Sequence, residues 1–222
     1  MTPDPVEPLS RKSRVSPESK GGERSPRGPS EGKPVLGVVI PTLDEAVRLP
    51  RLLRDLSALS LPHDVLVADG GSADRTRDLA RDSGAWVVRA PRGRGSQMNA
   101  GAWAMDTPWL LFLHADARVP PDSIRGLESW LRRAQETEFA TFTFALEGQH
   151  WFWRFIEAGQ RVRESLAGLA YGDQGLLISS RLFRSVGGFP DVPIMEDVEL
   201  LRVLRDVGDW RRVQAPIVSS PR

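Results

Sequence analysis

The sequence predicts an α/β fold in which a mostly parallel sheet is flanked by helices. Three observations predict it. Strand and helix patterns alternate from residue 35 onward, residues 109–113 form an unbroken apolar run, and acidic residues follow several expected strands. Alternating strands and helices form parallel sheets with right-handed crossovers. The carboxyl ends of parallel strands meet at one edge, so we expect the acids to line a common crevice.

The apolar run Trp109–Leu113 is the expected centre of the sheet. It follows Pro108 and is followed by His114-Ala115-Asp116. A short run without polar alternation is typical of a strand buried on both faces. His114 and Asp116 are therefore two candidate metal ligands at the ligand-binding end of a central strand.

The first expected strand covers residues 35–40 and ends at Pro41. Thr42-Leu43-Asp44-Glu45 then leads to a helix whose leucines, between residues 49 and 59, recur on one face. Asp44 or Glu45 is therefore the first acid that we expect to face the crevice.

A second strand, 64–69, ends at the carboxylate of Asp69. Gly70 and Gly71 favour a tight turn, and Ser72 is suited to cap a helix over residues 73–83. A third strand over 85–89 completes this unit. Asp69 is therefore expected to face the same crevice as the acids after the first strand.

The segment 91–102 combines glycines with arginines and precedes a helix. Arg92-Gly93-Arg94-Gly95 is followed by Ser96-Gln97-Met98-Asn99. Glycines let backbone amides approach a ligand, and helix N-termini attract anions. Together with Asp116 this segment favours a diphosphate ligand with a divalent cation, because Mg²⁺ often takes one or two carboxylates plus phosphate oxygens.

The second half is expected to mix helices and short strands. The helices are 123–133, 150–169, 180–186 and one that begins at Met195-Glu196-Asp197; the strands are 139–146, 176–178 and 210–213, the last followed by a short polar tail. Gly172-Asp173-Gln174-Gly175 interrupts the second of these helices.

Composition excludes several classes of protein. The chain has 30 basic and 29 acidic residues, which argues against a nucleic-acid binder. It has no cysteine, so disulfides and thiolate metal sites are excluded. No apolar run approaches the roughly 20 residues of a membrane span, and no signal peptide is recognised. Residues 1–34 lack aromatic residues and isoleucine, so we expect a disordered tail before one domain over 35–222.

Four motifs, in this order, resemble glycosyltransferase family 2, the inverting enzymes with a GT-A fold. They are Pro41-Thr42-Leu43-Asp44-Glu45, Asp69-Gly70-Gly71-Ser72-Ala73-Asp74, His114-Ala115-Asp116 and Glu196-Asp197-Val198-Glu199-Leu200. The segment 92–99 and Gly172-Asp173-Gln174 resemble one bacterial subgroup of the family, with His-Ala-Asp as the metal motif. The resemblance covers residues 35–222 and implies a GT-A-type, Rossmann-like fold.

The resemblance implies a sugar transferase that uses a nucleotide-sugar, with a UDP-sugar favoured, and Mn²⁺ or Mg²⁺. Asp116 would bind the metal, with His114 as a second ligand in place of the family's first acid. Asp197 would be the general base, and Asp173 is the next candidate for a catalytic role or for holding the acceptor. The donor-binding residues it implies are Pro41, Thr42, Asp44, Glu45, Asp69, Gly70, Arg94, Gln97, Asn99, His114 and Ala115.

Several alternatives remain open on the sequence. A sugar-phosphate nucleotidyltransferase would carry a Gly-rich basic loop after the first strand, where this chain has residues 41–45. A degenerate nucleotide-sugar-binding protein is the other alternative, suggested by His114 and the short C-terminus. The aromatic cluster 151–155 packs in a core, or contacts a lipid-linked acceptor or the membrane interface. We expect a cytoplasmic protein; the alternative is a peripheral protein that contacts the inner face of the membrane.

Overall fold

The computed structural model describes residues 33–146, 175–192 and 194–219. Nearly all of the expected tail, the expected helix 150–169 with its aromatic cluster, and Asp173 lie outside these residues. Within them the alternating order of strands and helices is confirmed.

The strands are β1 (Leu36–Thr42), β2 (His63–Asp69), β3 (Trp86–Arg89), β4 (Trp109–Phe112), β5 (Ala117–Arg118), β6 (Glu138–Leu146), β7 (Leu176–Ser179) and β8 (Asp209–Ser219). The helices are α1 (Leu49–Leu56), α2 (Thr76–Asp82), α3 (Arg94–Ala104), α4 (Pro121–Leu131), α6 (Ser180–Ser185) and α7 (Glu196–Val207).

The strands form one eight-stranded sheet in the order β3-β2-β1-β4-β7-β6-β8-β5. The half that contains β3, β2, β1 and β4 is parallel, as the alternating pattern predicts. β7 runs antiparallel to both β4 and β6, and β5 is antiparallel to β8, so the sheet is mixed. β4 lies in the interior between β1 and β7, which confirms the apolar run as a central strand.

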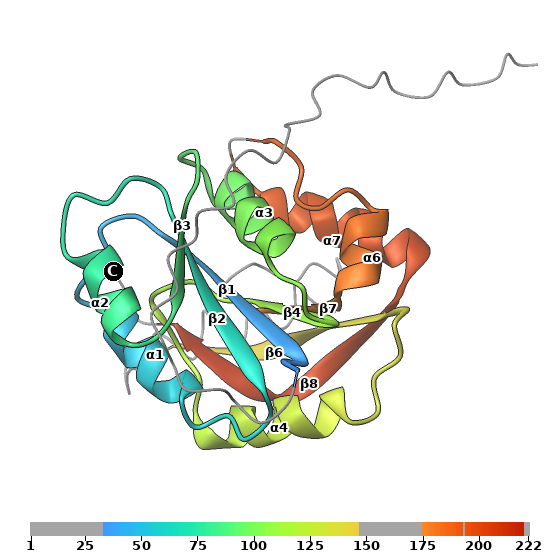
Figure 1. Cartoon of the computed structure of the whole chain (residues 1–222). Helices are drawn as coiled ribbons and strands as arrows, with labels where there is room; N and C mark the ends of the chain where they lie inside the picture. The colour runs from blue at the N-terminus through green and yellow to red at the C-terminus, as the bar shows by residue number, and fades with distance from the viewer. Residues whose placement is uncertain (1–32, 147–174, 193, 220–222) are drawn as a thin grey trace, which may run out of the picture.

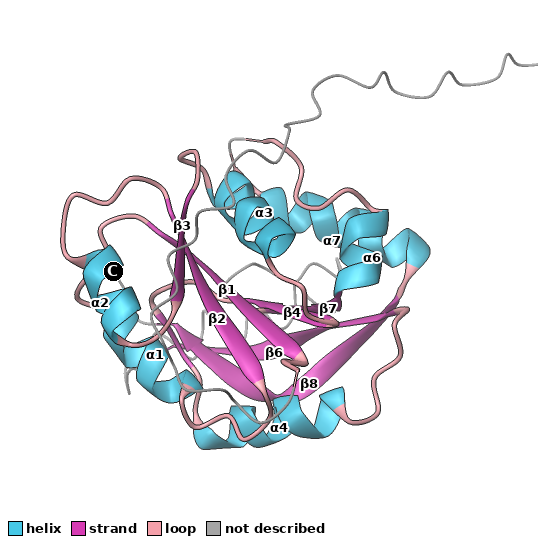
Figure 2. Ribbon diagram, viewed as in Figure 1, coloured by secondary structure: helices cyan, strands magenta, loops and turns pink. Residues whose placement is uncertain are grey.

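Helices cover both faces of the sheet. α1, α2 and α4 lie on one face, and α3, α6 and α7 lie on the other (Figures 1 and 2). Each face buries its own hydrophobic cluster. This three-layer arrangement leaves the carboxyl ends of β1, β2 and β4 at one edge, where the loops can form a crevice.

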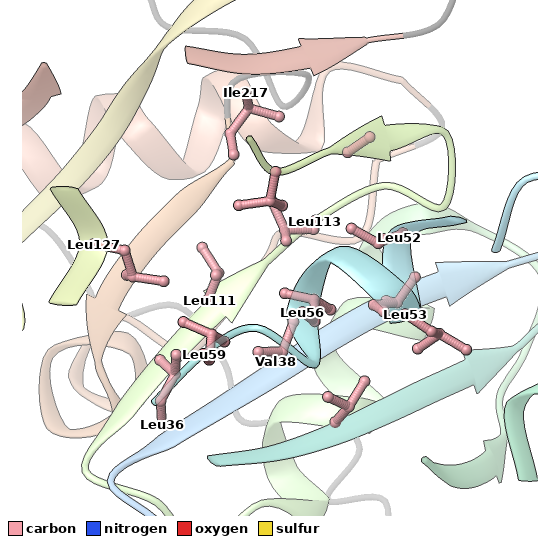
Figure 3. Packing of buried hydrophobic residues seen from close by; sticks show 14 of the residues in the cluster. Leu36, Val38, Leu52, Leu53, Leu56, Leu59, Leu111, Leu113, Leu127 and Ile217 are labelled. Atoms are coloured by element: carbon pink, nitrogen blue, oxygen red, sulfur yellow. The ribbon is translucent and has the colours of Figure 1, made fainter. Parts of the chain in front are cut away.

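The larger cluster packs the leucines of α1 against β1 and β4. Leu52 and Leu56 are buried against the central strands, and Leu127 of α4 and Ile217 of β8 extend the cluster (Figure 3). Burial of one such leucine stabilises the fold by roughly 1.5–3 kcal/mol. α1 is therefore a rigid element on which other contacts can be built.

β1 does not end at Pro41, contrary to the sequence expectation; it continues to Thr42. The backbone oxygen of Val39 accepts a hydrogen bond from Leu113, so residue 39 faces β4. Residue 41 faces the same side, where β4 has already ended at Phe112. The missing amide hydrogen of Pro41 therefore leaves no gap in the sheet.

Two further boundaries differ from the expectation. α2 begins at Thr76 rather than at residue 73, because the hydroxyl of Ser72 donates to Asp69 and does not cap the helix. β8 extends to Ser219 instead of ending near Val213. A register shift opposite Phe142/Thr143 accommodates Pro216, which is why the strand continues past a proline.

In the part of the chain that the structure describes, no helix has the length and apolar character needed to cross a bilayer.

Candidate functional site

A cleft of about 380 Å³ opens beyond the carboxyl ends of β1 and β4. Its volume falls in the range of small-ligand sites. It is lined by Pro41, Leu43, Glu45, Gly93, Arg94, Gln97, His114, Ala115 and Asp116. Residues from three separate motifs therefore meet in one cavity, as the sequence predicts for the crevice.

Asp44 adopts a left-handed conformation, with φ +56°, and its carboxylate turns toward the next loop. It accepts hydrogen bonds from the amides of Ala73 (2.7 Å) and Asp74 (3.4 Å). In return, its own amide donates to Ser72 Oγ, and the amide of Ala46 donates to Asp74. These reciprocal bonds join the loops after β1 and β2 into one wall of the cleft.

Asp69 is fully buried beneath this wall. Its carboxylate accepts hydrogen bonds from the amides of Gly71 and Ser72, from Ser72 Oγ, and from Thr42 Oγ1. The guanidinium of Arg77 lies 3.7 Å away. The structure thus shows Asp69 organising the loop; a direct contact with a nucleotide stays a prediction.

Asp74 belongs to the same wall, and its contacts there shift its pKa. Partial burial would raise this pKa, but hydrogen bonds from the hydroxyl and amide of Thr76 and from the amide of Ala46 outweigh it. The pKa of Asp74 therefore lies below its ordinary value, and the charged form is part of the folded wall.

The opposite wall is the N-terminus of α3. Gly93, with φ +132°, is the residue before the helix, so the helix begins at Arg94 and not after the glycine segment. The first amides of a helix have no partner within it, and Arg94 lines the cleft beside them. This end of α3 has the polarity and geometry to bind an anion.

Gln97 lies one turn further along α3 and is buried. Its Nε2 donates to the backbone oxygens of Thr42 and Ala68, at 2.8 Å each, which ties the ends of β1 and β2 to α3. A side chain at Gly70 would lie 3.2 Å from Gln97. Gln97 therefore shapes the cleft floor that it also lines, and Gly70 leaves room for it.

Asn99 points away from this cleft, toward the turn after α6. Its amide donates to the oxygen of Phe189 and accepts from the amide of Phe189, at 2.8 Å each. A side chain at Gly188 would collide with Asn99. Asn99 thus holds the segment that leads into α7, and it does not line the cleft.

His114 and Asp116 lie in the turn that connects β4 to β5, and both line the cleft. The turn is closed by a hydrogen bond from the amide of Ala117 to the oxygen of His114 (3.0 Å). In the described ranges no three metal-ligating side chains cluster. One carboxylate and one imidazole beside an anion-binding helix end nevertheless fit a cation that takes its other ligands from a diphosphate.

A second, much smaller cavity of about 20 Å³ adjoins the first. It is lined by Met98, Phe112, His114, Thr141, Gly175, Leu176, Phe189, Asp197 and Leu201. Asp197 lies in the first turn of α7, half-buried, with Oδ1 accepting from the amide of Val198. His114 borders both cavities, so it is the link between the expected base and the cleft.

The structure thus gathers part of the expected set. Pro41, Glu45, Arg94, Gln97, His114, Ala115 and Asp116 line the cleft; Thr42, Asp44, Asp69, Gly70 and Asn99 do not line it; Asp197 borders the adjoining cavity; and Asp173 lies outside the described residues. Thr141, which lines the smaller cavity, was not among the expected site residues, because it lies in none of the motifs.

The profile of the family described as glycosyl transferase family 2 matches residues 37–173, more than half of the chain. The chain belongs to this family. The match includes both wall loops, the N-terminus of α3 and the turn with His114 and Asp116. The fold predicted from the resemblance is therefore confirmed.

Curated relatives share the same region. An uncharacterized glycosyltransferase from Mycobacterium tuberculosis is 32% identical over 117 residues, which are 52% of this chain and 52% of the relative. The 4,4'-diaponeurosporenoate glycosyltransferase of Staphylococcus haemolyticus is 44% identical over 92 residues, 38% of this chain and 24% of the relative. The family 2 chain described here thus spans about half the length of the first of these relatives, and less of the second.

Among solved structures, glucosyl-3-phosphoglycerate synthase from Mycobacterium tuberculosis, in complex with Mn²⁺, UDP and glucosyl-3-phosphoglycerate, superposes with a TM-score of 0.64. The sequence identity is 21%, and the match covers 85% of this chain and 73% of the other. At this identity the likeness shows a common fold.

Proposed function

We propose that this chain transfers a sugar from a nucleotide-sugar, with a UDP-sugar favoured, to an acceptor hydroxyl with inversion at the anomeric carbon, and that it needs a divalent metal. The observation that carries the proposal is the shared cleft. An anion-binding helix end with Arg94 faces the turn of His114 and Asp116, and Asp197 borders the cavity that adjoins it.

Charge and shape support one arrangement of the donor in the cleft. Arg94 and the first amides of α3 would hold the diphosphate. Glu45 and the wall behind it would lie along the base and ribose. The glucosyl-3-phosphoglycerate synthase structure that superposes on this chain contains UDP and Mn²⁺, which supports a uridine nucleotide here.

Asp116 would hold the metal, with His114 beside it. A bound Mn²⁺ or Mg²⁺ supplies charge neutralisation for the departing diphosphate. Because imidazole is a better ligand for Mn²⁺ than for Mg²⁺, we propose Mn²⁺ as the preferred ion.

Asp197 would act as the general base. It would take the proton of the acceptor hydroxyl while that oxygen forms a bond to the anomeric carbon and the nucleoside diphosphate leaves with the bonding electrons. One displacement inverts the configuration, so no covalent link between enzyme and sugar forms. Asp197 is half-buried in a cavity largely lined by apolar side chains, an environment that would limit competition by water.

Exposed apolar side chains precede α7, the helix that begins beside Asp197. Val192, Ile194 and Met195 are exposed directly before α7, with Ile194 73% exposed. The name of the staphylococcal relative contains 4,4'-diaponeurosporenoate. We therefore propose an acceptor with an apolar part, such as a lipid-linked one, and peripheral contact with a membrane.

Titration calorimetry tests the donor and the metal. UDP and GDP are each titrated with Mn²⁺, with Mg²⁺ and with chelator, into wild type, Asp116→Ala and the control Asp122→Ala on the surface of α4. We expect UDP binding that Mn²⁺ strengthens, that Asp116→Ala weakens to the metal-free level, and that Asp122→Ala leaves unchanged. Equal affinity with Mn²⁺ and with chelator would contradict the metal site.

Product analysis tests the reaction and the acceptor. Radiolabelled sugar from UDP-sugar donors is followed into organic-soluble and water-soluble products of a membrane extract. Label in the organic phase supports the apolar acceptor, and label in the aqueous phase alone contradicts it. Nucleotide-sugar binding without product in either phase would favour a binding protein that has lost turnover.

A further inference from the structure

The turn that carries Asp116 is short and is anchored on both sides. Before it, the amide of Leu113 donates to Val39 of β1 at 3.1 Å. After it, the two residues of β5 pair with the end of β8, Ala117 opposite Ser219 and Arg118 opposite Val218. Two-residue strands contribute few hydrogen bonds, so the position of Asp116 needs further support from side chains.

That support comes from Asp55 on α1. Its Oδ2 accepts from Arg118 Nε at 2.6 Å and its Oδ1 accepts from Arg118 Nη2 at 3.1 Å. Oδ2 also accepts from the backbone amide of Val119 at 3.0 Å. A bidentate carboxylate–guanidinium pair fixes orientation as well as distance, and the third bond fixes the backbone itself.

The pair is sheltered and rests on a rigid helix. The side chain of Asp55 is 15% exposed and that of Arg118 is 36% exposed. Leu52 and Leu56, on either side of Asp55 along α1, are buried in the core (Figure 3). A carboxylate on such a helix cannot follow the turn, so the turn must conform to the helix.

We propose that Asp55 is a positioning residue for Asp116. It holds Arg118 and Val119, and thereby sets the position of the turn in which Asp116 faces the cleft. This inference rests on the proposed metal site for its effect on binding, and on the contacts above for its effect on the turn. Groups that orient a metal ligand from behind typically change metal affinity 10- to 100-fold when they are removed.

The first experiment is titration of UDP, with Mn²⁺ and with chelator, into Asp55→Ala. We expect Mn²⁺-dependent affinity to fall about 10-fold and metal-free UDP affinity to stay within a factor of about 2. Asp55→Asn, which keeps an oxygen for Val119, is expected to lose less. Asp55→Ala combined with Asp116→Ala should bind UDP as Asp116→Ala does, because Asp55 acts through Asp116.

Glu128→Ala is the matched control. Glu128 joins α4 to the segment between α1 and β2, by accepting from both the amide and the hydroxyl of Ser60 at 2.7 Å each, but it does not line the cleft. Its removal lowers stability without touching the turn. An equal loss of Mn²⁺-dependent affinity in Glu128→Ala and Asp55→Ala would overturn the proposal, because the effect would then be general.

Amide hydrogen exchange gives a readout that needs no ligand. In Asp55→Ala we expect the amides of Ala117 and Val119 to exchange at least tenfold faster relative to the amide of Leu66 in β2, and we expect no such change in Glu128→Ala. Unchanged exchange at Ala117 would overturn the proposal even if the donor and metal bind as expected. If wild type shows no metal-dependent UDP binding, the proposed function fails, and the exchange result still decides whether Asp55 holds the turn.

Discussion

The loops behind β1 and β2 form a closed wall, whereas the turn behind β4 and the first turn of α7 face the cavities. In the wall, Asp69 and Asp44 are engaged by backbone amides and hydroxyls of neighbouring loops. On the other side, Asp116 and Asp197 border cavities. The same kind of side chain therefore builds the wall in the first region and lines the cavities in the second.

The comparison predicts the largest effect on turnover at Asp197. Asp197→Asn keeps the shape of the side chain but cannot take a proton, so we expect transfer to slow by about 10²–10⁴-fold. UDP affinity should stay within a factor of about 2, as measured by calorimetry alongside the assay. Turnover within tenfold of wild type would mean that Asp197 is not the general base.

The largest effect on stability is expected at Asp69. Asp69→Ala leaves buried donors of Ser72 and the nearby Arg77 without their carboxylate, which costs about 3 kcal/mol of unfolding free energy. Urea unfolding measures it. Asp78→Ala, which removes an exposed acid on α2 paired with Arg81, is the control and should cost less than about 0.5 kcal/mol. Equal stability of the two variants would mean that the wall is not held by Asp69.

A smaller loss is expected at Gln97. Gln97→Leu leaves the backbone oxygens of Thr42 and Ala68 without this donor, so we expect a loss of about 2 kcal/mol in urea unfolding. The exposed Gln135 is the control, because Gln135→Leu removes no hydrogen bond of this kind. The affinity for UDP separates two roles of Gln97. If calorimetry shows that UDP affinity falls more than tenfold in a Gln97→Leu protein that remains fully folded, Gln97 contacts the ligand as well as holding the ends of β1 and β2.

The smallest effect concerns pH. The pKa of Asp74 lies below its ordinary value in the folded chain, so the charged form stabilises the wall above the unfolded pKa. This contribution is lost as the pH falls through the folded pKa. Between pH 6 and about pH 3 the melting temperature of wild type should therefore fall more than that of Asp74→Asn, by about 1 °C. Calorimetric scans measure it, and parallel pH profiles for the two proteins would contradict the assignment.

The parallel half of the fold could be predicted because its signals are local. The apolar runs of β1, β2 and β4 and the leucine spacing of α1 depend on neighbours a few residues away. The same local patterns misplaced Pro41 as a strand end. Whether a proline interrupts a sheet depends on which neighbouring strand its nitrogen faces, and that is a property of the assembled sheet.

The candidate site could also be predicted only in part. Residue type and order along the chain were enough to place Glu45, Arg94, His114 and Asp116 at one edge, because parallel strands bring their carboxyl ends together. Side-chain direction was not predictable. Asn99 turns to Phe189, 90 residues further along the chain, and Asp44 reaches the loop after β2.

The amino-acid order thus carries the family, the sheet-forming segments and the chemical character of the crevice, since each follows from short-range patterns and from motifs. Packing determines which acids support the wall and which face the cavities. A carboxylate is directed by the donors nearest to it in space, and for Asp55, which meets Arg118 from 63 positions away, those donors come together only when α1 docks on the sheet.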